Sequence, residues 1–243
     1  MDLAGKTILV TGGAVRIGRS ICEKLAQSGA QVIIHCRHSG REARELAARL
    51  KTPGHDAWVI QEDLDTEAGC ESVISRAFEL AGTLDGLVNN AAVFHRRSLS
   101  ETDLTHLLGE LRPNFFAPLL LIRAFIRRAQ TGRIVNILDR RIATLETGSM
   151  AYQLSKRALA DMTRLAALEL APAFTVNGVA PGPVLLPSDE KGCPRDKAGR
   201  IPTGRRPTPE EVADAVLTLL QADSVTGQIL FVDGGQHLLG NGD

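Results

Sequence analysis

The sequence predicts a single α/β domain in which helices cover both faces of a doubly wound parallel sheet of about seven strands. Two observations support this prediction. Short runs rich in Val and Ile alternate with longer helical patterns along all 243 residues, and several of the runs are apolar at every position. Strands that are apolar on both faces are typical of parallel sheets covered by helices. The unbroken alternation favours one domain over residues 1–243.

Each predicted element has its own signal in the sequence. The strand candidates lie at 7–12, 31–36, 57–63, 84–90, 132–138, 174–180 and 228–234. Helical patterns occupy 17–28, 40–51, 66–81, 100–111, 114–129, 150–171 and 209–221. The last helix begins with Thr208 as N-cap and Pro209 at its first position. The stretch 183–208 is rich in Pro, Gly and charge, so we expect either a substrate loop or a disordered segment there.

Composition and charge narrow the classes of function. Lys and Arg together number 28, as do Asp and Glu, so the zero net charge indicates no surface for a polyanion. The longest apolar run, 115–122, is much shorter than the roughly 18 residues that cross a bilayer. The four cysteines are scattered, as in a reducing compartment, and His55 and His106 lack the spacing of metal ligands. We therefore expect a cytoplasmic protein that binds no metal, nucleic acid or membrane.

A glycine-rich turn, TGGAVRIG at residues 11–18, follows the first predicted strand and opens the first helix. Glycines at this junction allow backbone N–H groups to approach the pyrophosphate of a dinucleotide. A tight turn without a ligand is the alternative, which the position at the first strand–helix junction disfavours. Arg16 occupies a place where glycine is often found, and its guanidinium would point towards the phosphates or the mouth of the site.

The end of the second predicted strand favours NADPH over NADH. Proteins that prefer NADH usually place an acidic residue there to bind the ribose 2′-hydroxyl. This sequence instead has HCRHS at 35–39, in which Arg37 would bind a 2′-phosphate unless the segment is simply a solvated basic loop. The predicted cofactor contacts are Gly12, Arg16, Ile17, Gly18, His35, Arg37, His38, Ser39, Asp63, Leu64, Asn90, Ala91, Ala92, Tyr152, Lys156, Pro181, Gly182 and Val184.

Two further strand ends contribute to this prediction. Asp63 would accept a hydrogen bond from the adenine amino group or, equally well, cap the following helix. Ala91 and Ala92 follow the fourth strand, where ligands bind in open α/β sheets, and their small side chains would let a flat ring approach the backbone.

Tyr152 and Lys156 are four residues apart and therefore share one face of the predicted helix. A nearby ammonium lowers the pKa of a phenol from about 10, which would let Tyr152 exchange a proton near neutral pH. A surface Tyr–Lys pair is the alternative. We expect the pair to lie beside an apolar stripe formed by Ala151, Leu154, Ala158, Met162, Leu165 and Leu168.

Taken in order, TGGAVRIG, NNAA at 89–92, Asn114, YQLSK at 152–156 and APG at 180–182 resemble the short-chain dehydrogenase/reductase family over essentially the whole chain. The resemblance implies a Rossmann-type fold in which Lys156 binds the nicotinamide ribose and Asn114 supports a water relay. It also implies a homotetramer built partly on the helix that carries Tyr152.

Within that family the sequence is most similar to pteridine reductases and dihydromonapterin reductases. The shared features are Arg16, the HCRHS segment, Phe94, and Asp139 in place of the usual serine. This likeness implies an NADPH-dependent reductase in which Phe94 and the nicotinamide sandwich a flat pterin.

Asp139 carries the prediction about the substrate. In most relatives a serine at this position donates to the substrate carbonyl, whereas an ionised carboxylate cannot donate and repels the developing negative charge. Asp139 therefore suits a ring C=N bond beside N–H donors. Alternatively, Asp139 only pairs with Arg140 or Arg141, or Thr147 or Ser149 replaces the serine. The predicted catalytic residues are Asp139, Tyr152, Lys156 and Asn114, and the predicted substrate contacts are Arg16, Phe94, Asp139 and Tyr152.

The leading hypothesis is thus an NADPH-dependent reductase that takes a dihydropterin or dihydrofolate to its tetrahydro form. One alternative is a carbonyl reductase acting on a ketone such as a 3-oxoacyl thioester or a sugar. Another is a nucleotide-sensing protein without chemistry, but such proteins typically lose the Tyr or the Lys. The charged run 95–97 suggests either a contact with an acidic substrate tail or a solvated surface.

Overall fold

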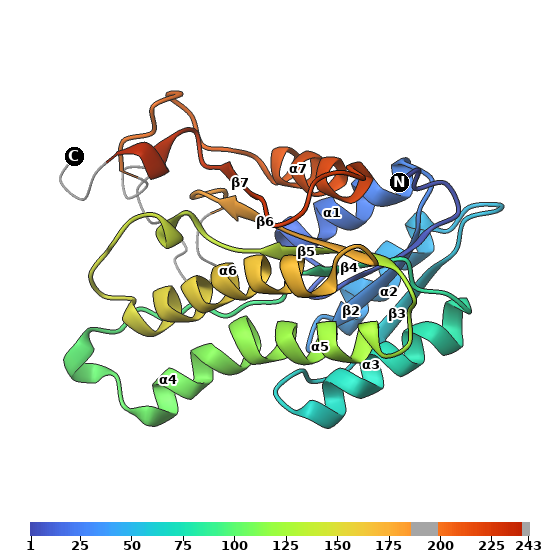
Figure 1. Ribbon diagram of the computed structural model, residues 1–243, viewed down its shortest axis with the longest axis horizontal. Coiled ribbons are helices and arrows are strands. Elements are labelled where there is room, and N and C mark those ends of the chain that lie inside the picture. Colours follow the sequence, from blue (N-terminus) through green and yellow to red (C-terminus); the bar gives the residue numbers. More distant parts are fainter. Residues whose placement is uncertain (186–198, 240–243) are drawn as a thin grey trace.

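The computed structural model describes residues 1–185 and 199–239, which form one sheet between two layers of helices (Figure 1). The seven strands are all parallel and lie in the order β3-β2-β1-β4-β5-β6-β7. Their bounds are β1 (Thr7–Val10), β2 (Gln31–Cys36), β3 (Ala57–Gln61), β4 (Gly86–Asn89), β5 (Gly132–Ile137), β6 (Phe174–Pro181) and β7 (Ile229–Val232). The predicted doubly wound α/β architecture is confirmed.

Within the described residues, seven α-helices connect or flank these strands. They are α1 (Arg16–Gln27), α2 (Gly40–Leu50), α3 (Glu67–Ala81), α4 (Leu104–Leu111), α5 (Ala117–Ile126), α6 (Met150–Leu170) and α7 (Pro209–Gln221). Thr208 caps α7 as predicted, because its side chain accepts from the Glu211 N–H and the Glu211 carboxylate accepts in return. In the part of the chain that the structure describes, no helix combines the length and apolarity needed to cross a membrane.

Alternating strand residues divide the core between the two faces of the sheet. Ile8 and Val10 of β1 pack towards α1, α2 and α7, whereas Leu9 packs towards α3 and α5. Figure 1 shows α1 and α7 on one side of the sheet and α5 and α6 on the other. Burial on both faces explains why the strands have no polar face in the sequence.

The apolar stripe predicted for α6 is wrong in position. Leu154, Leu165 and Leu168 are exposed, with Leu168 at 81%. The buried side of the helix instead carries Tyr152 and Lys156 themselves. The prediction failed because it counted only apolar residues as inward-facing, although this helix packs against the sheet largely through small and polar side chains.

The strand order locates the ligand-binding edge of the sheet. The chain runs outward from β1 to β3 and then returns to β4 beside β1, so the connections after β1 and β4 lead to opposite faces. Parallel strands leave a crevice where such connections diverge, at their carboxyl ends.

Candidate active site

A cleft of about 600 Å³ opens at this carboxyl edge of the sheet. Its lining includes every predicted cofactor residue except Val184, together with Asp139: Gly12, Arg16, Ile17, Gly18, His35, Arg37, His38, Ser39, Asp63, Leu64, Asn90, Ala91, Ala92, Tyr152, Lys156, Pro181 and Gly182. Residues that the sequence analysis did not single out also line it: Ala14, Val15, Cys36, Asp65, Val93, Pro113, Ile137 and Leu138. Most of these flank a predicted residue in the chain.

The glycine-rich turn is fixed by close backbone packing. A Cβ on Gly18 would lie 2.1 Å from the Gly12 carbonyl oxygen, so only glycine fits there. Asn90 donates through Nδ2 to the carbonyls of Thr11 and Gly12 and ties the turn to the end of β4. Arg16 has φ of +54°, the left-handed conformation that glycine adopts most readily. The backbone here has the shape of a glycine turn although an arginine occupies it.

The first turn of α1 fits an anionic ligand. Val15, its N-cap residue, has no side chain able to accept from the first N–H groups, and α1 has no acidic residue in its first turn. Orphan N–H groups at a helix N-terminus attract phosphate oxygens. The turn therefore has the donor set that the pyrophosphate of a dinucleotide requires.

His35 has a structural role that the sequence analysis did not predict. Its side chain is buried, with Nδ1 3.3 Å from the Gly12 N–H and Nε2 3.1 Å from the Glu62 carbonyl oxygen. Burial lowers the pKa of this imidazole to about 4, so it is neutral at physiological pH. His35 supports the glycine turn and does not supply the positive charge that the HCRHS segment suggested for a 2′-phosphate.

Arg37 is the charged member of that segment at the cleft. Its guanidinium lies 2.8 Å from Asp63 Oδ2 and 3.3 Å from Asp65 Oδ2. Asp63 does not cap α3, because the Thr66 side chain accepts from the Gly69 N–H at that position. The alternative in which Asp63 caps a helix is therefore wrong. Its other oxygen accepts from the Asp65 N–H within the same loop.

Asp139 connects the phenol to a guanidinium. Its Oδ2 accepts from the Tyr152 hydroxyl at 2.9 Å and from Arg141 Nη1 at 3.1 Å, while Oδ1 accepts from the Arg141 N–H at 2.8 Å. Arg141 is held in turn by Glu146, which also pairs with Arg140. Asp139 thus faces Tyr152, as the catalytic prediction requires, and also pairs with Arg141, as the alternative prediction requires. The two predictions are therefore compatible.

The other alternative placed the missing serine hydroxyl at Thr147 or Ser149. Neither residue lines the cleft: Thr147 is exposed, and the Ser149 hydroxyl accepts from Gln153 Nε2. Of these three residues, Asp139 is the one that lines the cleft and bonds the Tyr152 hydroxyl.

The structure does not show the expected lowering of the Tyr152 pKa by Lys156. Burial, and then the negative charge of Asp139, raise the pKa of Tyr152 well above its ordinary value. Lys156 Nζ donates to the Ile137 carbonyl at 2.8 Å, and burial lowers the pKa of this amine to about 8 against the opposing charges of Asp139 and Glu110. Tyr152 is thus a protonated phenol, ready to donate, beside a lysine that titrates near physiological pH.

Phe94 lies directly against the catalytic phenol. Its ring meets that of Tyr152 edge to face, with centroids 4.8 Å apart and an interplanar angle of 79°. The guanidinium carbons of Arg96 and Arg141 lie 5.6 and 5.3 Å from the centroid of the Phe94 ring. Phe94 is not among the residues that line the cleft, but this contact places its ring beside Tyr152, which does line it.

Asn114 is the predicted catalytic residue whose side chain does not line the cleft. It is fully buried at the π-helical turn between α4 and α5, where Oδ1 accepts from the Val93 N–H and Nδ2 donates to the Val93 carbonyl. Nδ2 also lies 3.1 Å from Ser155 Oγ and 2.9 Å from Glu110 Oε2. The sequence analysis missed Glu110, although its place four residues before Asn114 in a helical pattern was a usable signal.

The predicted substrate loop is only partly described. Residues 186–198 lie outside the described residues. Val184 is described but does not line the cleft, and it packs beside the core formed with α1, α2 and α7. Gly182 approaches the end of β7 closely, since a Cβ there would lie 2.8 Å from Asp233 Cα.

Comparisons with known proteins find similar sequences and a similar fold in reductases. A family model described as Enoyl-(Acyl carrier protein) reductase matches residues 13–237. The crystal structure of FolM Alternative dihydrofolate reductase 1 from Brucella canis, complexed with NADP, superposes with a TM-score of 0.92 at 34% identity, covering 98% of this chain and 96% of that one.

Two curated relatives point to different substrates. The 3-oxoacyl-[acyl-carrier-protein] reductase FabG of Aggregatibacter actinomycetemcomitans is 33% identical over 95% of this chain and 98% of its own length. Pteridine reductase 1 of Leishmania tarentolae is 32% identical over 95% of this chain and 96% of its own length. The family model and these identities establish the family of this chain but not its substrate. The Tyr152–Lys156 pair at the carboxyl edge of the sheet agrees with that family. The chain belongs to the short-chain dehydrogenase/reductase family.

Proposed function

We propose that this protein is an NADPH-dependent reductase that transfers hydride to a C=N bond of a pterin-like ring, taking a dihydropterin or dihydrofolate to its tetrahydro form. The observation that carries the proposal is the 2.9 Å hydrogen bond from the Tyr152 hydroxyl to Asp139. It places a carboxylate where the family usually has a hydroxyl donor.

The surroundings of Asp139 consist of hydrogen-bond donors. Three donors point at its two oxygens: the Tyr152 hydroxyl, the Arg141 guanidinium and the Arg141 N–H. In all three contacts Asp139 acts as an acceptor. An anion only accepts hydrogen bonds, so it repels a ketone oxygen that gains negative charge during reduction. It attracts the N–H groups on the edge of a pterin.

Proton delivery follows from the same geometry. Reduction of a ring C=N bond requires a proton on the nitrogen. Tyr152 is a protonated phenol at the cleft and can donate that proton, because burial and then the charge of Asp139 raise its pKa well above the ordinary value. Asp139 is partly exposed, with 15% of its side chain accessible, so it provides the step by which solvent restores the phenol proton.

The cleft residues fit NADPH. The turn at 11–18 would hold the pyrophosphate through the N-terminus of α1, Arg37 would bind the 2′-phosphate, and Lys156 would bind the nicotinamide ribose. When bound, NADPH supplies the hydride. The structures of FolM from Brucella canis and Brucella suis contain NADP, which supports this choice of cofactor.

Phe94 would provide the platform for the substrate ring. Its contact with Tyr152 keeps it beside the proton donor, and the Arg96 and Arg141 guanidinium groups border it. Aromatic faces bind flat heterocycles by offset stacking. Arg16, at the mouth of the cleft, is the proposed polar contact for the substrate from the opposite side.

A carbonyl reductase is the second candidate, because the FabG relative matches the chain as well as the pteridine reductase does. The two candidates differ at position 139, where a ketone reductase needs a donor. Asp139 donates to none of its described neighbours, because its oxygens accept from the Tyr152 hydroxyl and from Arg141.

The test is a steady-state assay with NADPH and three substrates: dihydrobiopterin, dihydrofolate and a 3-oxoacyl thioester. We expect turnover of the pterins by the native protein. In Asp139→Ser, pterin activity should fall about 100-fold, in the range of lost acid–base catalysis, while thioester activity rises. Asp161→Ser, which removes an exposed carboxylate of α6, is the matched control. Good thioester turnover without any pterin turnover would reject the proposal.

We also propose that the protein assembles as a homotetramer in the cytoplasm. The exposed apolar residues Leu154, Leu165 and Leu168 of α6 and Leu119 of α5 support a contact with a second copy of the chain. Size-exclusion chromatography with light scattering would test this, because a monomer at micromolar concentration contradicts it. The buried free thiols of Cys22, Cys36 and Cys70 agree with a reducing compartment.

A further inference from the structure

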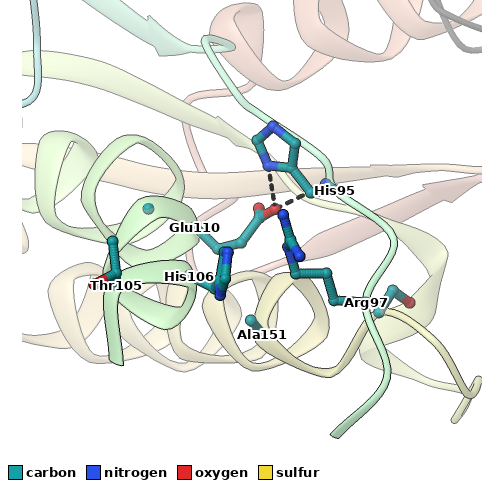
Figure 2. Close-up of a pocket in the computed structure, with 8 residues that line it drawn as sticks. His95, Arg97, Thr105, His106, Glu110 and Ala151 are labelled. Atoms are coloured by element: carbon teal, nitrogen blue, oxygen red, sulfur yellow. Dashed lines mark hydrogen bonds and ion pairs between the residues drawn. The ribbon is translucent and has the colours of Figure 1, made fainter. Parts of the chain in front are cut away.

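Glu110 of α4 is a carboxylate buried beneath the active site, with only 3% of its surface exposed. One oxygen, Oε1, accepts from the His95 N–H at 2.8 Å and lies 2.9 Å from His95 Nδ1 (Figure 2). The other, Oε2, accepts from Asn114 Nδ2 at 2.9 Å. An ionisable group at this depth costs folding free energy unless it is well paired, so its position calls for a reason.

The partner on the inner side is the family's catalytic asparagine. Asn114 uses its carboxamide to hold both polar groups of the Val93 backbone, and Val93 lines the cleft. Glu110 fixes which end of that carboxamide donates, because a carboxylate oxygen accepts only from Nδ2. Glu110 therefore reinforces the orientation of Asn114 that the Val93 backbone also imposes, and with it the wall of the cleft at Val93.

The charge of Glu110 also reaches the catalytic pair. Asp139 and Glu110 are the two acidic groups whose charges counter the burial of Lys156. They act from different elements, since Asp139 follows β5 and Glu110 belongs to α4. Removing either negative charge favours the neutral form of the lysine.

On its outer side Glu110 is covered by His95. Figure 2 shows the His95 ring over the carboxylate, with Arg97 and His106 beside a pocket of about 140 Å³. His95 is largely exposed, at 65% of its side chain, whereas Glu110 is not. The groups that face Glu110 are thus His95 from the loop after β4, Asn114 from the π-helical turn, and His106 and Arg97 across the small pocket.

We propose that Glu110 is a positioning residue for the Tyr152–Lys156 pair, which orients Asn114 and gives the site a second buried negative charge besides Asp139. The proposal applies to reduction of either candidate substrate, because it concerns residues that both reactions use. It is therefore independent of the pterin assignment.

The experiment compares two substitutions that separate charge from reach. Glu110→Gln keeps the size of the side chain and an acceptor oxygen for Asn114 but removes the charge. Glu110→Asp keeps the charge but shortens the reach to Asn114. The readout is the pH profile of kcat and kcat/KM from pH 6 to 10 for the NADPH complex, with whichever of dihydrobiopterin or the 3-oxoacyl thioester the native protein reduces. Glu79→Gln on α3 is the control for a lost carboxylate, because this exposed side chain bonds only Ser75 among the described residues.

For Glu110→Gln we expect the alkaline limb of the profile to move to lower pH by on the order of 0.5–1 unit, since a lysine that lacks one anion loses its proton earlier. For Glu110→Asp we expect the limb to stay in place while kcat falls several-fold. Glu79→Gln should match the native profile.

A folded Glu110→Gln variant with the native alkaline limb and native kcat would overturn the proposal. If Glu110→Gln does not fold, Glu110→Asp decides the matter. A variant that loses thermal stability but keeps native kcat and kcat/KM would reduce Glu110 to a structural residue, whereas the several-fold loss of kcat at an unmoved limb would support the proposal.

Discussion

The two halves of the cleft are held in place by different physical means. On the cofactor side, between β1 and β4, backbone contacts set the geometry, as the 2.1 Å approach that a Gly18 Cβ would make to Gly12 shows. On the catalytic side, between β5 and α6, charged side chains set it, through the contacts of Asp139 with Tyr152 and Arg141. The first half should tolerate changes in charge better than an added methyl group, and the second half the reverse.

The largest effect should come from Tyr152→Phe on the catalytic side. Loss of the hydroxyl removes the proton donor and frees Asp139 from its 2.9 Å partner, while the ring contact with Phe94 remains. We expect kcat to fall about 1,000-fold, in the range for lost general acid catalysis. NADPH affinity, measured by fluorescence titration, should stay within about threefold. Turnover close to the native rate would show that another group donates the proton.

On the cofactor side, the corresponding change is Gly18→Ala, a single methyl group without charge. Its Cβ would meet the Gly12 carbonyl and, at 2.6 Å, Asn90 Nδ2, so the turn must shift. We expect NADPH affinity to fall by about 100-fold and stability by about 1–3 kcal/mol, as for an overpacked site. Calorimetry with and without NADPH measures both.

Gly109→Ala on α4 is the matched control. A Cβ at Gly109 meets nothing within 4 Å, so this variant should gain about 0.5–1 kcal/mol and bind NADPH normally. Equal behaviour of the two alanine variants would contradict the idea that backbone packing defines the cofactor side.

The difference between the halves also explains what the sequence could predict. The fold and the cofactor turn were predictable, since alternation, strand composition and the glycine spacing are local signals that backbone geometry imposes. Even Arg16 was recognised as standing in a glycine place, and its φ of +54° agrees. The bounds of α5 were not predictable, because the π-helical turn at Arg112–Phe116 delays its start to Ala117.

The catalytic side depends on tertiary neighbours, which a sequence does not display. The functional face of α6 was misjudged because polar residues there find buried partners, as Lys156 does at the Ile137 carbonyl. His35 was predicted only as a cofactor contact, and no local signal shows that burial keeps its imidazole neutral beneath the glycine turn. The contact between Glu110 and His95 was not predictable, because His95 lies in a loop that no periodic pattern connects to α4.

Arg141→Gln tests the role of charge on the catalytic side with a smaller expected effect. The variant loses the guanidinium 3.1 Å from Asp139 Oδ2, so the carboxylate loses a charged partner that holds it beside Tyr152. We expect kcat/KM for dihydrobiopterin to fall about tenfold, in the range for one lost hydrogen bond to a charged group. Arg140→Gln is the control, because Arg140 also pairs with Glu146, whereas the guanidinium that bonds Asp139 within the described residues is that of Arg141. Similar losses in both variants would mean that the Glu146 network, and not the charge at Asp139, is responsible.

The smallest effect should come from a change of charge on the cofactor side, Arg37→Gln. Arg37 has 45% of its side chain exposed and already pairs with Asp63 and Asp65. Solvent and these carboxylates therefore weaken its electrostatic interaction with a phosphate. We expect NADPH affinity to fall about tenfold, which corresponds to about 1.4 kcal/mol, and NADH affinity to change less than about twofold. Arg41→Gln, at the exposed start of α2, should leave both affinities unchanged.

The loss of NADPH affinity in Arg37→Gln should shrink as salt is raised from 50 to 500 mM, because screening weakens the same interaction in the native protein. An equal loss for NADPH and NADH would place Arg37 at the shared part of the cofactor and not at the 2′-phosphate, and the preference for NADPH would then need another source, such as His38 or Ser39 at the same edge of the cleft.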